Sequence, residues 1–547
     1  MKGDDIIRGL YELWKITKPN ILFLSIGLLF SLIGTSVSLY IPLIIRNDLN
    51  ESSISTNTVV IIILCFGLTL IFSGVSTYIL GYIGQKIIQN IRIVTWNKLI
   101  KLPYDFHLKN SASNLTSRLV NDTMNITRIF SEELSTFLTN LFSVIVSLTF
   151  LFVINKTLTL YLICTLPILV IVMLPIGKVM KRVSSKSQEA TANLSSYYSN
   201  RLSIIKLIKT LSTYNVERKH NYSLLKKLFD IELHKIKVLS FFEPIMNLLL
   251  FVNIFGILFF GYYLMENNVM KSGDMFAYIL YLFQIINPIV SITSYWTEVQ
   301  RAIGASDRIL KINKEQEEVF TVDTAYNNVA QKVKINDLNF TIENKQIINS
   351  ISLNFYKGYI YNIIGESGCG KSTLLNILAG LNTGYTGNIY LDDFDKEQFS
   401  KYEWRSLFSY ITQDLQILED TIYNNLIYGI DETKNIEEVR AACAMTNSLF
   451  FIQNLKNGFN TQISPDSINL SIGQKQRLVL TRAFLQKKPI ILLDEVTSNL
   501  DKESHKYIIK SIEELAQTSI VLNVTHRHDK NDFSNSNVKL IDFRQFN

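Results

Sequence analysis

Long apolar runs alternate with polar segments over the first 300 residues of the chain. Six apolar runs lie at 21–45, 59–83, 137–154, 158–176, 241–263 and 275–292. Most of them approach the roughly 20 residues that an α-helix needs to cross a bilayer. The pattern therefore predicts six membrane-spanning helices, and an even number returns the chain to the side on which it started.

The polar segments between the runs predict which side of the membrane each one faces. Segment 47–58 contains two acidic residues and no Lys or Arg, whereas segments 84–130 and 177–240 are rich in basic residues. Basic loops stay in the cytoplasm, so we predict that both long segments are cytoplasmic. Their helical periodicity further predicts that the second to fifth spans continue well beyond the bilayer. Residues 1–20 carry charges of both signs and no cleavage site, which predicts a cytoplasmic amphipathic helix.

The pattern changes after residue 310. Segment 311–332 is predicted to be a linker with a solvated face, and from Val333 onward apolar and polar residues alternate as they do in strands. A strand at 359–364 leads into GESGCGKST at 365–373 and then into an apolar helix. We therefore predict an all-α membrane domain of six helices at 21–310, followed by an α/β P-loop NTPase domain at 333–547.

The sequence GESGCGKST fits a phosphate-binding loop. Its glycines let the backbone wrap closely, so that N–H groups and the following helix amino terminus face phosphate oxygens. Lys371 would reach the terminal phosphates of ATP, and the Ser372 hydroxyl would bind Mg²⁺. The predicted ATP-binding residues of this loop are Gly365, Glu366, Ser367, Gly368, Cys369, Gly370, Lys371, Ser372 and Thr373.

A second candidate group follows the apolar strand PIILLDE at 489–495. The strand places Asp494 and Glu495 at its carboxyl end, where parallel sheets bind ligands. We expect Asp494 to bind Mg²⁺, Glu495 to act as general base on the attacking water, and Gln413 to contact metal and water.

Composition excludes several other classes of function. The net charge is +7, but the basic residues lie mainly between the apolar runs, which indicates membrane topology and no nucleic-acid partner. The four cysteines, Cys65, Cys164, Cys369 and Cys443, lack the spacing of a zinc site or a disulfide framework.

At this point the chain resembles the exporters of the ATP-binding cassette family. Besides the two motifs above, LSIGQKQR at 470–477 is similar to the family signature, SNLD at 498–501 to its D-loop, and VTHR to the segment with its switch histidine, here His526. KLPYDFHLKN, LTSRLVNDT and ASDRIL are similar to the first intracellular loop and the exit of the sixth helix.

The resemblance implies a dimer in which each ATP lies between two subunits. The phosphate loop of one subunit would face Ser471, Gly473 and Gln474 of the other, with Asp501 and His526 completing the site. The partner would be a second copy of the chain or a homologous half-transporter. Cytoplasmic hairpins near 114–117 and 209–215 would carry the movement to the membrane helices.

Two residues depart from the family pattern. Ile472 replaces the first of two signature glycines, which leads us to expect slowed turnover; it is tolerated if this position is helical. Ile342 replaces the aromatic residue that stacks on adenine, a contact worth about 1 to 3 kcal/mol, so we expect weak ATP affinity. Segment 463–469 also lacks the usual glutamate pattern.

These observations favour ATP-driven export of a peptide or amphipathic compound across a bacterial cytoplasmic membrane, within its lipid. Lipid flipping uses the same machinery and is an alternative function that the sequence leaves open. A non-transporting, ATP-gated regulatory protein is another alternative. Glu495 and His526 argue against this last function, because a protein that only binds nucleotide needs no general base.

Overall fold

The computed structural model describes residues 20–51, 55–318, 330–342, 345–430, 434–464, 470–497, 502–525 and 537–546. Contacts divide the chain into two compact units. The helical unit contains Met1–Thr95 and Ser117–Lys311, and the α/β unit contains Trp96–Thr116 and Ile312–Asn547. Each unit is described separately below.

Long helices contain all six predicted spans: α2 (Ile21–Asn50), α3 (Thr56–Ile100), α7 (Leu134–Ile154), α8 (Lys156–Ser203), α10 (Tyr214–Glu266) and α11 (Ser272–Lys314). Among the described residues, four helical stretches, 21–50, 56–100, 112–154 and 214–266, are long and apolar enough to cross a membrane. The other two spans lie in α8 and α11. Helix α10 has 53 residues and is therefore about 80 Å long, far more than a hydrocarbon layer of about 30 Å. Helix α10 is therefore longer than a single crossing requires, and the cytoplasmic extension of the other spans stays a prediction.

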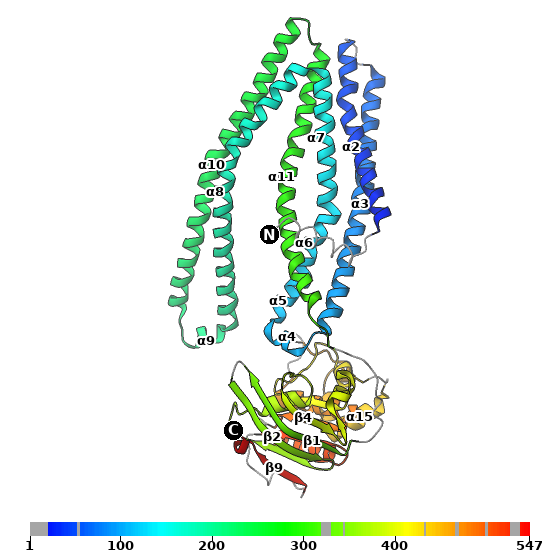
Figure 1. Cartoon of the computed structure of the whole chain (residues 1–547), viewed down its shortest axis with the longest axis vertical. Helices are drawn as coiled ribbons and strands as arrows, with labels where there is room; N and C mark the ends of the chain where they lie inside the picture. The colour runs from blue at the N-terminus through cyan, green and yellow to red at the C-terminus, as the bar shows by residue number, and fades with distance from the viewer. Residues whose placement is uncertain are drawn as a thin grey trace. The chain divides into compact units, whose positions relative to one another are not determined.

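Short elements connect these helices. α4 (Tyr104–Lys109) and α5 (Ala112–Ser117) follow α3, and the chain then runs through η1 (Arg118–Asp122), α6 (Thr123–Arg128) and η2 (Ile129–Glu133) into α7. Asn155 forms the tight turn into α8, where its side chain accepts hydrogen bonds from the N–H groups of Thr157 and Leu158. Figure 1 shows α8 and α10 side by side, joined through α9 (Ile205–Thr210).

The α/β unit contains two sheets. Strands in the order β2-β1-β4-β5 form an antiparallel sheet, and strands in the order β6-β7-β8-β3-β9 form a parallel sheet. All residues of β3, β7 and β8 are buried, as expected for parallel strands covered on both faces. The strands are β1 (Lys332–Ile342), β2 (Lys345–Tyr356), β3 (Ile360–Ile364), β4 (Thr386–Leu391), β5 (Phe394–Asp395), β6 (Phe408–Ile411), β7 (Ile490–Asp494), β8 (Ile520–Val524) and β9 (Val538–Asp542).

Helices connect and flank these strands. α12 follows the predicted phosphate loop directly, and α17 begins within the signature segment. The helices are α12 (Lys371–Leu378), η3 (Lys396–Gln398), α13 (Lys401–Ser406), α14 (Ile422–Ile427), α15 (Ile436–Met445), α16 (Leu449–Gln453), η4 (Gly458–Asn460), α17 (Ile472–Gln486), α18 (Lys502–Ala516) and η6 (Phe543–Phe546).

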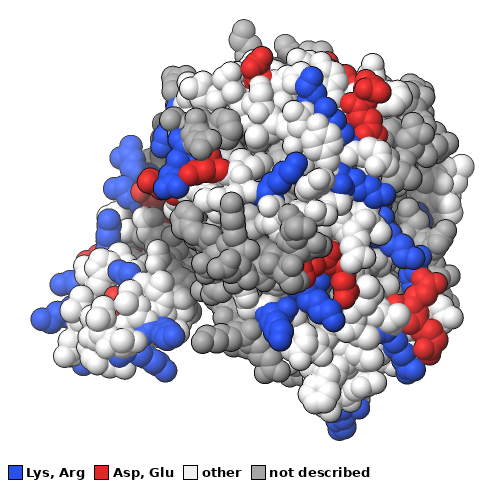
Figure 2. All heavy atoms as spheres, turned by 90° about the horizontal axis from the view of Figure 1, so that it is seen from below, with Lys and Arg blue, Asp and Glu red and all other residues white. Residues whose placement is uncertain are grey.

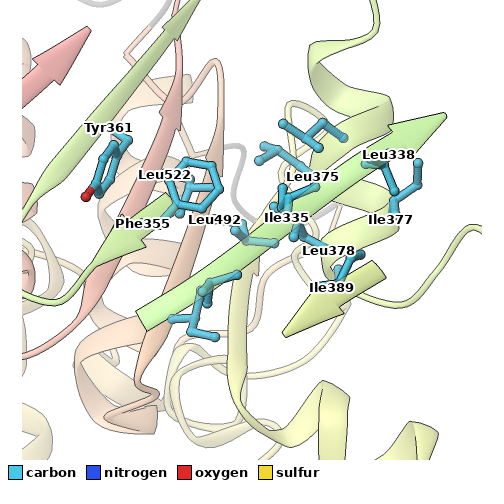
Figure 3. Close-up of a cluster of buried hydrophobic side chains, with 14 of the residues drawn as sticks. Ile335, Leu338, Phe355, Tyr361, Leu375, Ile377, Leu378, Ile389, Leu492 and Leu522 are labelled. Atoms are coloured by element: carbon cyan, nitrogen blue, oxygen red, sulfur yellow. The ribbon is translucent and has the colours of Figure 1, made fainter. Parts of the chain in front are cut away.

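The main core of this unit joins both sheets to α12. Ile335 of β1, Leu375 and Leu378 of α12, Leu492 of β7 and Leu522 of β8 are all nearly completely buried in it. Figure 3 shows these side chains gathered together. Because α12 packs on the strands through this core, the sheet fixes the position of the loop that precedes the helix.

Surface charge of both signs is mixed on the face drawn in Figure 2. Lys and Arg side chains alternate there with Asp and Glu and with uncharged residues. The sequence-based expectation of no nucleic-acid partner stays a prediction.

The domain limits predicted from the sequence stay predictions. Residues 1–19 and 319–329 lie outside the described residues, so they do not test the amphipathic helix or most of the linker. Helix α11 continues to Lys314, and β1 begins at Lys332. Segment 96–116, which we predicted within the membrane domain, groups with the α/β unit. The Thr383 hydroxyl donates to Asp105 of α4 across 3.3 Å, so within this unit α4 contacts the segment that follows α12. The predicted role of 114–117 stays a prediction.

Candidate nucleotide-binding site

The predicted phosphate loop lies between a buried strand and a helix amino terminus. β3 ends at Ile364 and α12 begins at Lys371. Gly368 and Gly370 have φ angles of 83° and 96°, which glycine adopts without strain. A Cβ atom on Gly370 would also lie 2.9 Å from the Ile347 carbonyl oxygen. The loop conformation therefore requires glycine at this position, as expected of a backbone that wraps around phosphate.

Lys371 brings a positive charge to this loop. Its side chain is buried, and its ammonium group donates to the carbonyl oxygens of Gly365 and Glu366 at 2.9 and 2.7 Å. The sulfur of Cys369 lies 3.7 Å from the same nitrogen. Loop residues Glu366 and Ser367 are exposed, whereas Thr373 is half-buried in the first turn of α12. The ammonium group is thus positioned where phosphate oxygens can replace the carbonyl acceptors.

Ser372 and Asp494 meet, although 122 positions separate them in the sequence. The Ser372 hydroxyl donates to the Asp494 carboxylate across 3.1 Å. Asp494 ends β7 and is only 5% exposed. A hydroxyl and a carboxylate oxygen this close together fit the oxygen ligands that Mg²⁺ prefers.

Gln413 and Glu495 form the second polar contact of the site. The Gln413 amide donates to the Glu495 carboxylate across 2.9 Å. Glu495 has a φ angle of 54°, and its backbone N–H donates to the Val524 carbonyl across 3.0 Å. A left-handed backbone at a residue other than glycine is uncommon and concentrates at functional sites. The surrounding sheet thus fixes the direction in which the Glu495 carboxylate leaves β7.

The signature residues form the amino terminus of α17. Ser471 caps this helix: its hydroxyl oxygen accepts from the Gln474 N–H at 3.2 Å, and the Gln474 side chain accepts from the Ser471 N–H at 2.9 Å. Gly473 lies in the same turn. Ile472 is the first helical residue, is not among the described residues with positive φ, and is 57% exposed. A helical backbone accepts isoleucine, so this departure introduces no backbone strain.

Part of the predicted site lies outside the described residues. Asp501 belongs to 498–501 and His526 to 526–536, and the structure does not test their roles. Ile342, at the end of β1, is 46% exposed.

Two arginine contacts were not predicted. Glu318, expected on the solvated face of the linker, is instead buried, and its side chain is only 3% exposed beside Arg405. Sequence alone gives no signal for this pair, because its members lie 87 positions apart. Arg482 of α17 donates to the carbonyl oxygens of Gln416 and Asn425 at 3.2 and 2.8 Å. Burial lowers the pKa of Arg482, and its contacts fix the segment that follows Gln413.

Comparison with known proteins agrees with this architecture. The family described as "ABC transporter transmembrane region" matches residues 24–289, and the family described as "ABC transporter" matches residues 348–498. An uncharacterised protein encoded in the epiA 5' region of Staphylococcus epidermidis is 85% identical over 275 residues, which are 50% of this chain and all of that protein.

Two more distant relatives have descriptive names. A "Multidrug resistance ABC transporter ATP-binding and permease protein" of Lactococcus lactis subsp. lactis is 27% identical over 95% of this chain and 89% of its own length. An "ATP-dependent lipid A-core flippase" of Desulfotalea psychrophila is 28% identical over 82% of this chain and 79% of its own length. The chain belongs to the ATP-binding cassette transporter family, as a multi-pass, exporter-type ATPase whose transmembrane region is fused to one ATP-binding domain.

Proposed function

We propose that this exporter acts as a homodimer that moves a peptide or another amphipathic compound out of a bacterial cytoplasm, with Mg²⁺ and ATP at the nucleotide sites. The fused half-transporter architecture implies a dimer. The observation that carries the substrate class is a polar cavity in the helical unit.

This cavity has a volume of about 580 Å³ and lies among α2, α3, η2 and α7. Serine and threonine side chains and Glu132 form most of its wall. Glu132 precedes the outer end of α7, Ile154, by about 33 Å along the helix axis at 1.5 Å per residue. The carboxylate therefore lies near the cytoplasmic boundary of a hydrocarbon layer of about 30 Å, and the hydroxyl groups extend into the layer.

The hydroxyl oxygens that line this cavity can accept hydrogen bonds from a ligand. Thr35, Thr69, Ser76 and Thr139 each donate their proton to a backbone carbonyl oxygen, at 2.9, 2.8, 2.8 and 2.9 Å. Their lone pairs are left for a ligand. Together with the Glu132 carboxylate, they favour a molecule with N–H donors and positive charge. Peptide amides and amines have this chemistry, and an apolar part of the same molecule would contact the surrounding helices.

Lipid flipping is the second candidate function, and one relative is named a flippase. A lipid with an anionic headgroup would place its negative charge beside Glu132 at the cytoplasmic boundary of the hydrocarbon layer, where the two like charges repel each other. The cavity therefore favours the peptide or amphipathic compound. A purely regulatory ATP-binding protein would not require the contact between Gln413 and Glu495.

The nucleotide site supports hydrolysis in the following way. Ser372 and Asp494 would bind Mg²⁺, which would neutralise phosphate charge. Because the Gln413 nitrogen donates to Glu495, its amide oxygen is left to accept from a water or to bind the metal. Glu495 would take the proton of the attacking water.

A second copy of the chain would complete each site. The Ser471 oxygen accepts the Gln474 N–H within the helix cap, so its own proton is left to donate to the γ-phosphate of ATP bound by the partner. The amino terminus of α17 adds the positive end of its helix dipole. Gly473 and Gln474 would face the same phosphate, and Asp501 and His526 complete the proposed set.

ATP hydrolysis by the purified chain in lipid nanodiscs tests this proposal. We expect Mg²⁺-dependent hydrolysis that a cationic amphipathic peptide raises and that vanishes in Glu495→Gln. A matched peptide with glutamine in place of lysine should raise it less. Glu132→Gln should weaken the response to the cationic peptide while leaving basal hydrolysis unchanged.

Other outcomes separate the alternatives. Stimulation by phosphatidylglycerol but by neither peptide would favour lipid flipping. If the folded chain reproducibly fails to hydrolyse ATP, this would favour a different half-transporter as partner, or a regulatory role.

A further inference from the structure

An ion pair with a buried carboxylate lies where the last membrane helix enters the α/β unit. Glu318 follows the end of α11 by four residues. Its carboxylate accepts two hydrogen bonds from the Arg405 guanidinium, at 2.6 and 2.8 Å, and lies 3.5 Å from the Lys401 ammonium. The Glu318 side chain is only 3% exposed. A buried carboxylate of this kind depends on its bidentate partner, because it has lost its contact with water.

The same two residues also contact the backbone of two other segments. The Glu318 N–H donates to the carbonyl oxygen of Lys101, just beyond the end of α3, across 2.9 Å. Arg405 donates to the carbonyl oxygen of Gly380 across 2.8 Å. Gly380 lies in the turn that ends α12, the helix that begins with Lys371. One ion pair therefore connects the end of α3, the exit of α11 and the carboxyl end of the phosphate-loop helix.

Neighbouring contacts reinforce this connection. Trp404, next to Arg405, is 1% exposed and donates to the Leu378 carbonyl of α12 across 2.7 Å. By contrast, the Glu317 carboxylate lies 3.2 Å from the Lys98 ammonium and is 42% exposed. An exposed ion pair contributes little rigidity. Of these two described ion pairs, the one between Glu318 and Arg405 therefore has the more buried carboxylate.

We propose that the Glu318–Arg405 pair is a coupling joint, through which a displacement of α12 on ATP binding moves α3 and α11. Both are uninterrupted helices, of 45 and 43 residues, that continue into the membrane region, and a helix transmits displacement along its axis. The two side chains are positioning residues, since neither belongs to the phosphate site. This inference rests on the proposed ATP-driven transport.

Hydrogen–deuterium exchange on the full chain in nanodiscs tests the joint without a known substrate. The reporter is the loop 267–271 between α10 and α11, at the far end of α11 from Glu318. In the wild type, we expect Mg²⁺, ATP and vanadate to change exchange in this loop. Glu318→Gln should bind ATP within about threefold of the wild-type affinity yet lose the change in the loop. Glu317→Gln is the matched control and should keep it.

A second variant separates coupling from folding. Arg405→Lys keeps the positive charge but not the bidentate geometry or the second contact to Gly380, so it should also bind ATP and lose the response. An unchanged loop response in either variant, with ATP bound, would overturn the inference while leaving the proposed transport intact. A wild-type chain that binds ATP without any response in the loop would overturn both.

Discussion

The side-chain amide of Gln413 donates a hydrogen bond to the Glu495 carboxylate across 2.9 Å, although 82 positions separate the two residues. They meet because β6 and β7 are neighbouring parallel strands, so the segments that follow them leave the sheet at the same edge. The contact joins the segment after β6 to the carboxylate best placed to take a proton.

Glu495→Gln is predicted to lower ATP hydrolysis at least about 100-fold and to leave ATP bound, because an amide cannot accept the proton of the attacking water. Hydrolysis and retained nucleotide are measured on the same nanodisc sample. Glu419→Gln, an exposed residue six positions after Gln413, should hydrolyse at the wild-type rate. Undiminished hydrolysis in Glu495→Gln would exclude it as the general base.

Local patterns in the sequence predicted much of this site. The phosphate loop follows one apolar strand, and Asp494 and Glu495 lie at the end of another. Parallel strands bring their carboxyl ends together. That rule anticipated the meeting of Ser372 with Asp494. The six apolar runs predicted the long helices in the same way, because span length and helix periodicity are properties of neighbouring residues.

Contacts between distant residues outside these motifs could not be predicted. Glu318 lies in a charged segment whose composition favours solvent, and only the fold brings Arg405 over it. The assignment of segment 96–116 to the α/β unit depends likewise on contacts with residues more than 200 positions away. The left-handed backbone of Glu495 follows from the fixed geometry of β7 and β8, which one sequence does not reveal.

Ile472→Gly is predicted to raise ATP turnover by at least about threefold, while stability changes by less than about 1 kcal/mol. Ile472 is exposed beside Ser471 at the first position of α17, so its removal opens the serine to the partner's phosphate without altering the cap. Steady-state hydrolysis in nanodiscs measures the effect. Ser471→Ala should have the opposite effect on ATP hydrolysis, which should fall. Loss of the helix cap should also lower the free energy of unfolding by about 1 kcal/mol. Equal turnover in Ile472→Gly and wild type would show that Ile472 does not slow the reaction.

Arg308→Met is predicted to destabilise the helical unit by about 1 to 2 kcal/mol. The Arg308 guanidinium of α11 donates to both carboxylate oxygens of Asp122 in η1, at 2.7 and 2.5 Å, and Asp122 is 6% exposed. Asp122 in turn raises the pKa of Arg308. Loss of the arginine leaves a buried carboxylate without this partner, which lowers the thermal unfolding midpoint in detergent.

Arg301→Met is the control for this prediction. Arg301 belongs to the same helix and pairs with Glu298, but its side chain is 56% exposed, so the change should stay within about 0.5 kcal/mol. If both variants unfold at the same temperature, the Asp122 contact contributes nothing measurable.

Lys396 is predicted to make stability rise with pH above neutrality. Burial in the α/β unit, and then the positive charges of Arg405 and Lys401, lower its pKa to about 7, whereas Asp395 and Glu397 act in the opposite direction. An unfolded lysine has a pKa near 10.4, so between about pH 7 and 10 the unfolded chain binds a proton that the folded chain does not. The free energy of unfolding therefore increases through this window, by at most about 1.4 kcal/mol per pH unit. Below about pH 7 Lys396 is protonated in both states, so the buried ammonium lowers the free energy of unfolding by its full amount.

The test compares thermal unfolding midpoints of the full chain in detergent between about pH 6 and 9. Lys396→Met removes the titrating group, so its midpoint should depend on pH less than that of the wild type. It also loses the hydrogen bond that Lys396 donates to the Ile377 carbonyl across 2.8 Å, which shifts the midpoint equally at every pH. Lys345→Met, at an exposed position at the start of β2, should keep the wild-type dependence. A parallel pH dependence in wild type and Lys396→Met would show that this lysine stays charged in the folded chain, its ammonium stabilised by the ring faces of Tyr385 and Trp404, which lie 4.7 and 5.7 Å away.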